Sequence, residues 1–163
     1  MFPVAYQTTT GPIDDCRAAA TIALREYWHG LPVRSGGLPS YADVQLMDLY
    51  KIAHQVSVKD VIDGGRDFVN RYWGSELTRA LGFEATGKRV SEYQPDEMRD
   101  MLFTRYIGIV SSRAPVLYRA RIEHIHHRKH VPYEVLHVPF VREGGDEISN
   151  IMTVYEFNTS APE

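Results

Sequence analysis

The segments with strand character in this chain fall into two groups, instead of alternating one by one with helices. The first group is residues 55–62 and 66–77, which are joined by an Asp-Gly-Gly turn typical of a hairpin. The second group comprises residues 115–127, 132–141 and 147–157. A parallel sheet needs a helical crossover between successive strands, so this order argues against a doubly wound fold. It predicts an α+β domain built on one five-stranded antiparallel sheet with helices on one face.

Helical sequence lies between the two groups and also before the first. Residues 95–113 form the clearest helix, because Pro95 suits a first turn, acidic residues follow it, and apolar residues recur at helical spacing. An extra N-terminal helix is predicted in the alanine-rich run that follows two aspartates and ends at Gly30. Ser40 is placed to cap a further short helix.

These elements divide the chain into four parts. We expect a flexible lead over residues 1–13, a helical extension over 14–54, the core domain over 55–157 and a tail over 158–163. The total of 163 residues suits a single domain with a core of ordinary size.

Composition narrows the classes of function. The net charge of −3 gives no general attraction to nucleic acid or anionic membranes, and the basic residues are scattered. Cys16 is the only cysteine, so an internal disulfide, a CxxC redox pair and a cysteine-rich zinc site are excluded. The first residues lack the pattern of a secretory signal, and no apolar run approaches the ~20 residues of a membrane span. We therefore expect a cytoplasmic protein that binds neither membrane nor nucleic acid.

Four histidines stand within seven residues, at His124, His126, His127 and His130. On a strand, His124 and His126 would share one face, and either Glu123 or Glu134 could complete a zinc site with them. The Arg-Lys pair within the same stretch would repel a divalent cation, however. We expect no metal here, and read these histidines as the end of a strand.

Polar residues within the predicted strands raise the alternative of an enzyme. Asp60, Glu134 and His137 are the candidates for acid–base work, which needs two such groups close together in a closed pocket. Their spacing alone does not show that any two of them converge. We therefore expect no catalysis, and keep a small α+β enzyme or binding protein for a hydrophobic metabolite as the alternative.

The order of strands, glycine-bearing turn and long helix in the core resembles that of a PAS domain. Residues 68–73, Phe-Val-Asn-Arg-Tyr-Trp, are similar to the family's strand with an asparagine near aromatic residues. Residues 81–88, Leu-Gly-Phe-Glu-Ala-Thr-Gly-Lys, resemble its glycine-bearing turn, and a long helix with three strands follows. Residues 23–34 and 71–93 look most like a stand-alone PAS subfamily abundant in alphaproteobacteria. Residues 31–40 depart from that subfamily, because they have fewer acidic residues than its proline-arginine loop.

The resemblance implies a non-catalytic sensory or regulatory domain that acts in signal transduction through small-ligand binding and protein–protein interaction. It implies a PAS core over 55–157 with a ligand pocket between the sheet and the long helix. The expected pocket residues are Tyr72 or Trp73, Met101, Leu102, Tyr106, Ile109, Tyr118, Ile122 and Leu136. We expect neither haem nor flavin, since residues 95–113 contain no histidine and the turn at 81–88 contains no cysteine. The ligand and the partner protein are not indicated.

The last two predicted strands carry apolar residues in both registers, whereas a half-exposed sheet alternates cleanly. The outer face of the sheet therefore needs a cover, and the N-terminal helix can provide it by folding back or by crossing to a second subunit. The resemblance also implies pairing through this helix. We expect a homodimer whose interface includes Ala19, Ile22, Ala23, Tyr27 and Trp28.

Overall fold

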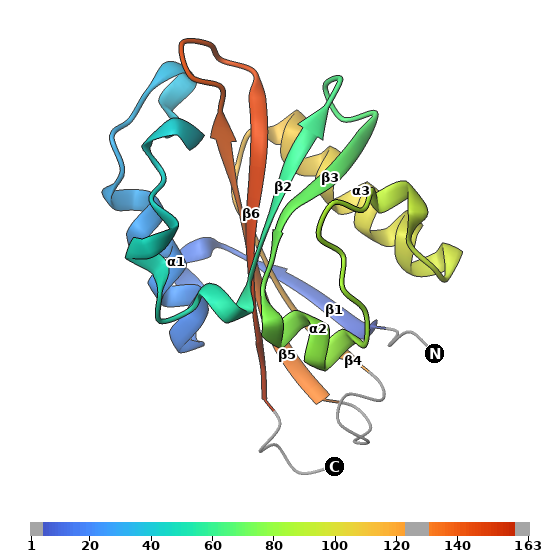
Figure 1. The fold of residues 1–163 in the computed structure, drawn as a ribbon. Helices are drawn as coiled ribbons and strands as arrows, with labels where there is room; N and C mark the ends of the chain where they lie inside the picture. The colour runs from blue at the N-terminus through green and yellow to red at the C-terminus, as the bar shows by residue number, and fades with distance from the viewer. Residues whose placement is uncertain (1–4, 123–130, 159–163) are drawn as a thin grey trace.

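The computed structural model of the chain describes residues 5–122 and 131–158, with the backbone alone for residues 5–9 and 122. It is an α+β fold on one antiparallel six-stranded sheet in the order β1-β4-β5-β6-β2-β3 (Figure 1). The strands are β1 Ala5–Gly11, β2 Val56–Ile62, β3 Asp67–Trp73, β4 Val116–Ile122, β5 Val131–Val141 and β6 Ile148–Phe157.

The prediction of five strands was wrong by one, at the N-terminus. Residues 5–11 were expected to belong to a flexible lead, but they form β1, which pairs with β4 and sets Thr10 opposite Tyr118. This threonine-rich segment lacks the alternation of apolar and polar residues that predicts a strand. Its place is decided by the open edge of β4, where unpaired backbone groups accept another strand.

The helices follow the prediction with two local differences. They are α1 Ala19–Gly30, α2 Ser75–Leu81 and α3 Asp96–Ser112. Ser40 accepts a hydrogen bond from the Ala42 N–H as a cap should, but the helix expected after it is a series of 3-10 turns within residues 41–55. The second expected strand is also shorter, because β3 ends at Trp73 and α2 begins two residues later.

Helices cover both faces of the sheet, because the extra N-terminal helix α1 lies on the face opposite α3. On one face α3 sets Tyr106 against His137 of β5, with ring centroids 5.5 Å apart. On the other, Trp28 of α1 donates a hydrogen bond from Nε1 to the Pro139 carbonyl at 2.9 Å. Figure 1 shows α1 and α3 on opposite sides of the central strands. The structure thus has three layers, with β5 and β6 in the middle one.

The cover over the outer face is the chain's own N-terminal helix, which was one of the two arrangements predicted. Ala20, Leu24 and Trp28 of α1 are buried there. Of the residues expected at a dimer interface, Trp28 is therefore buried within its own chain, while Ala19 is exposed and Ile22, Ala23 and Tyr27 are partly exposed. Pairing of two chains stays a prediction.

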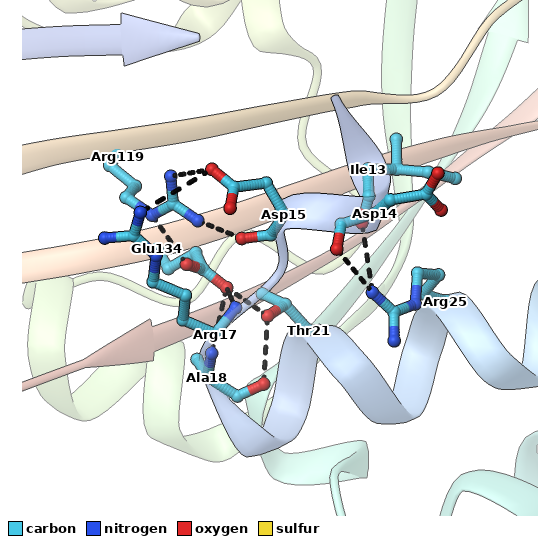
Figure 2. Close-up of polar contacts among 9 residues, drawn as sticks. All are labelled: Ile13, Asp14, Asp15, Arg17, Ala18, Thr21, Arg25, Arg119 and Glu134. Atoms are coloured by element: carbon cyan, nitrogen blue, oxygen red, sulfur yellow. Dashed lines mark hydrogen bonds and ion pairs between the residues drawn. The ribbon is translucent and has the colours of Figure 1, made fainter. Parts of the chain in front are cut away.

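A buried carboxylate attaches α1 to the sheet (Figure 2). One oxygen of Glu134 in β5 accepts hydrogen bonds from the N–H groups of Arg17 at 2.9 Å and Ala18 at 3.0 Å, and from the Thr21 hydroxyl. The other oxygen accepts from Nε of Arg119 at 2.8 Å. Since Ala18, at the N-cap, has no side chain able to cap the helix, Glu134 supplies the cap from a distant strand.

Glu156 of β6 stands directly opposite Glu134 and reaches the same helix end. Its Oε1 lies 3.3 Å from the Ala20 N–H. Two carboxylates side by side on a sheet repel each other, but here both face the positive end of a helix, and Arg119 binds one of them. The N-terminus of α1 is therefore held by electrostatics as well as by apolar packing.

Replacing Glu134 should loosen this attachment. We expect Glu134→Gln to lower the free energy of unfolding by about 2 kcal/mol, because Arg119 loses its buried anionic partner. Glu26→Gln on the exposed side of α1 is the matched control and should change stability by less than about 0.5 kcal/mol. Urea unfolding of both variants gives the comparison, and equal losses would contradict a special role for Glu134.

The same contact predicts how stability depends on acid. Burial alone would raise the pKa of Glu134, but hydrogen bonds from Thr21, Ala18, Arg17 and Arg119 outweigh burial and lower it. A carboxylate with a lowered folded-state pKa stabilises the fold fully above its unfolded pKa, and this contribution is lost as the pH falls through the folded-state pKa. The wild type should therefore lose more stability than Glu134→Gln between pH 5 and pH 3.

Candidate functional site

A small cavity of about 40 Å³ lies between α3 and the sheet. The sheet contributes Lys59 of β2, Trp73 of β3, Tyr133 of β5 and Tyr155 of β6 to its wall. The helical face contributes Leu81, Met98, Met101, Leu102, Arg105 and Tyr106, and the loop between them adds Phe83 and Tyr93. A cavity of this size has room for a water molecule or a ligand of a few heavy atoms.

Lys59 is the unusual residue of this cavity, because it is 1% exposed and forms no ion pair with an acidic side chain of the described residues. Within residues 5–122 and 131–158, its only hydrogen bond runs from Nζ to the Ser57 hydroxyl at 3.2 Å. The ammonium also lies over the ring of Tyr106, 4.8 Å from the centroid, and 5.7 Å from that of Trp73. Burial lowers the pKa of Lys59 to about 7.

Unpaired polar atoms gather on the same face of the sheet. Among the described residues, Trp73 Nε1, Asn70 Oδ1 and His137 Nε2 are buried without a hydrogen-bond partner. Trp73 borders the cavity itself. Buried polar groups are rarely left unpaired in a folded protein, so such a group beside a cavity indicates a place for a polar ligand or water.

Three tyrosines of the cavity wall and the nearby His137 remain uncharged near neutral pH. Burial raises the pKa of Tyr155 to about 12 and raises those of Tyr93 and Tyr106 further. Burial, with Arg105 and Lys59 nearby, holds the pKa of His137 well below its usual value. The His137 ring is fixed by a 2.6 Å contact between Nδ1 and the Thr153 hydroxyl. Near neutrality, Lys59 is therefore the one of these groups whose charge a small change of environment can alter.

Most of the predicted pocket residues on α3 line this cavity, and most of those predicted on the strands do not. Met101, Leu102 and Tyr106 are in the wall, and of the two alternatives on β3, Trp73 lines it. Tyr72 instead donates a hydrogen bond to the Ala53 carbonyl at 2.9 Å. The prediction that Tyr72 itself contributes to the pocket is not supported by this geometry.

The other predicted pocket residues lie outside the cavity for different reasons. Ile109 is a buried residue of α3, but it lies outside the cavity wall. Tyr118 lies under the Arg105 guanidinium, 4.2 Å away. Leu136 has the parity of Glu134 on β5 and thus faces α1, since successive side chains of a strand point to opposite faces. The side chain of Ile122 lies outside the described residues.

The sequence interpretation missed the polar residues of the cavity. Lys59, Tyr93, Arg105, Tyr133 and Tyr155 were not selected as site residues, although they line it. A signal was available for Lys59, since a lysine stands in the β-branched segment Val-Ser-Val-Lys-Asp-Val-Ile. A charged residue in a strand buried on both faces is uncommon and marks a site to be inspected.

The sheet separates His137 from Asp60 and Glu134, the other two candidates for acid–base chemistry. Glu134 caps α1 on the outer face, and Asp60 is bound there by Arg71 and Asn150, each at 2.7 Å. His137 faces α3 instead. No two of these three residues form a catalytic pair.

The histidine stretch, with Glu123, lies outside the described residues. Within the described ranges no group of three or more His, Cys, Asp or Glu side chains could hold a metal ion. Glu134, which was considered with Glu123 as the carboxylate ligand beside two histidines, instead binds Arg119 and the end of α1.

A larger, open groove of about 530 Å³ borders the start of α1. Its wall includes Arg119, Glu134 and Glu156, which already bind one another or the helix N-terminus. We regard the smaller cavity as the candidate site, because its wall holds the buried Lys59 ammonium and the Trp73 Nε1–H, which has no hydrogen-bond partner among the described residues.

No family model, curated protein or solved structure matches the chain. The resemblance to PAS domains therefore remains a prediction. None of the helices in the described ranges combines the length and apolar character needed to cross a bilayer.

The buried lysine predicts an alkaline rise in stability. Its pKa is about 7 when folded and 10.5 as an ordinary lysine, so the unfolded chain binds the extra proton between these values. Stability therefore increases with pH in this range, by up to ~1.4 kcal/mol per pH unit. Lys59→Met should be more stable at pH 7 and should lack this increase.

Urea unfolding at pH 7.5, 8.5 and 9.5 measures the effect. Lys51→Met is the control, because Lys51 is exposed. It should retain the wild-type slope. A slope unchanged in Lys59→Met would show that the lysine does not titrate in this range.

Proposed function

We propose that this chain is a non-catalytic sensory or regulatory module of the PAS type, which binds a small ligand between α3 and the sheet. The observation that carries the proposal is the cavity beside Lys59, with polar groups left unpaired around it. A cavity walled by a long helix and the strands facing it is where the resemblance expects a ligand. Regulation would follow because a ligand there contacts α3 and the central strands together.

The arrangement of β2–β6 supports the same proposal. These five strands are the predicted ones, and α2 and α3 pack with the short turn Val90–Glu92 on the face that holds the cavity. Output would pass to a partner protein or to a second copy of the chain. We propose homodimer formation as part of this function, with the exposed side of α1 available for it.

Native mass spectrometry of freshly purified protein tests ligand retention and subunit number together. Leu102→Phe adds a ring to the cavity wall and should reduce ligand retention at least about tenfold. Ile107→Phe on the exposed side of the same helix is the matched control and should retain the ligand as wild type does. Retention unaffected by Leu102→Phe, or absence of a small-molecule complex in wild type across ligand screens, would contradict the proposal.

One observation favours the enzyme alternative. A lysine amine with a pKa of about 7 is substantially uncharged at neutral pH, which is the form that attacks carbonyl carbon. In that reaction the amine nitrogen bonds to the carbonyl carbon and the oxygen leaves as water, giving an imine. A cavity with such an amine next to apolar side chains would suit a short aldehyde or ketone.

Borohydride trapping separates the two functions. The wild type is incubated with butanal or acetone, reduced with borohydride and digested for mass spectrometry. The regulatory proposal predicts equal, low modification of Lys59 and the exposed Lys51. Strong selective modification of Lys59 would replace it with the enzyme alternative.

A further inference from the structure

We propose that the cavity beside Lys59 binds a short-chain carboxylate, with the carboxylate at Lys59 and the hydrocarbon tail toward α3. The inference rests on the proposed function, in that it names the chemical class of the small ligand. It is carried by the distribution of charge, of hydrogen-bond donors and of apolar side chains around the cavity.

The charge in the cavity wall is of one sign. Lys59 and Arg105 both line the cavity, and no Asp or Glu is among its wall residues within the described ranges. The Lys59 ammonium forms no ion pair with a carboxylate of the described residues. Bringing an anion to this ammonium supplies the partner that the fold itself does not provide, whereas a cationic ligand would add to the repulsion.

The unpaired hydrogen-bonding capacity of the wall is mainly that of donors. A lysine ammonium has three N–H bonds, and the fold uses one of them at Ser57. Trp73 Nε1–H has no partner among the described residues and can only donate. A carboxylate accepts at two oxygens with about four lone-pair directions and can satisfy both groups at once. An alcohol or amide offers fewer acceptor sites and no charge.

The opposite wall is apolar. Leu81 of α2 and Met98, Met101 and Leu102 of α3 line it. This favours a hydrocarbon tail and disfavours phosphate or sulfate, which present oxygen in every direction. The volume of about 40 Å³ limits the tail to a few carbons. A carboxylate of the size of propionate meets all three requirements.

Such binding must be linked to a proton. The titratable and charged groups that face Lys59 from the packed elements are Tyr93, Arg105, Tyr106, Tyr133, His137 and Tyr155. Burial raises the pKa of Tyr93, Tyr106 and Tyr155 and lowers that of His137, so these four do not change charge between pH 6.5 and 8.5. Lys59 is left as the group that takes up a proton when an anion binds. Affinity should then fall about tenfold per pH unit above 7.

Calorimetric titration with propionate and with uncharged propionamide tests the inference. In wild type, propionate should bind at pH 6.5, should bind at least about tenfold more weakly at pH 8.5, and should take up a proton at the higher pH. The uptake is read from the dependence of the heat on the buffer. Propionamide should show neither the pH dependence nor the uptake.

Two variants and one control assign the contacts. Lys59→Met should lose propionate binding by at least about tenfold while remaining folded by circular dichroism, and Trp73→Phe, which keeps a ring but removes the donor, should weaken it several-fold. Lys51→Met should bind as wild type does. If Lys59→Met did not fold, the pH dependence and Trp73→Phe would still decide.

The outcomes separate this inference from the function on which it rests. If propionamide bound as well as propionate in wild type and in Lys59→Met, the ligand class would be wrong, while small-ligand binding would stand. Tighter binding of sulfate than propionate would also overturn the carboxylate assignment. If native mass spectrometry showed no small-molecule complex and the cavity-filling Leu102→Phe changed nothing, the proposed function itself would fail.

Discussion

The two-sided burial of β5 and β6 is the constraint on which the rest of the structure depends. Of the eleven residues of β5, all except Pro132 are buried, because α1 packs on one face of the strand and α3 on the other. Alternation along a strand then sends consecutive residues to different environments. Glu134 and Leu136 meet α1, and Tyr133 and His137 meet the layer of α3. One strand thereby holds the N-terminal helix and forms part of the candidate site.

The two layers treat a buried charge in opposite ways. Glu134 is surrounded by donors from a helix end, a hydroxyl and Arg119, so its charge is stabilised and contributes to the attachment of α1. Lys59 is even less exposed than Glu134 but has one hydroxyl and two aromatic rings around it. A buried charge whose hydrogen bonds are all satisfied stabilises the folded state. A charge that the fold leaves unpaired destabilises it, and its retention is most simply explained by a partner from outside the chain.

Much of the architecture could be predicted from local pattern, and part of the site could not. The hairpin of β2 and β3, the helix after Pro95 and the last three strands follow from turn residues and from periodicities that act over a few residues. Met101, Leu102 and Tyr106 share a helix face for the same reason, and all three line the cavity. Leu136 was assigned to the wrong face, because a strand that is apolar in both registers does not reveal which register faces which layer. Lys59 and Arg105 come from segments 46 residues apart, and no local rule brings them to one cavity.

By itself, the sequence determined the α+β class, the antiparallel pairing of its predicted strands and the apolar faces of α1 and α3, because helix and strand periods and turn chemistry are encoded within short windows. Only the tertiary structure decided that the N-terminal segment adds a sixth strand, that α1 covers its own sheet, and that Lys59 lies in the interior without an ion-pair partner among residues 5–122 and 131–158. The physical reason is that these outcomes depend on which distant groups come together. Edge pairing, helix capping by a remote carboxylate and the environment of a buried charge arise from contacts between residues far apart in the chain, and no short segment contains them.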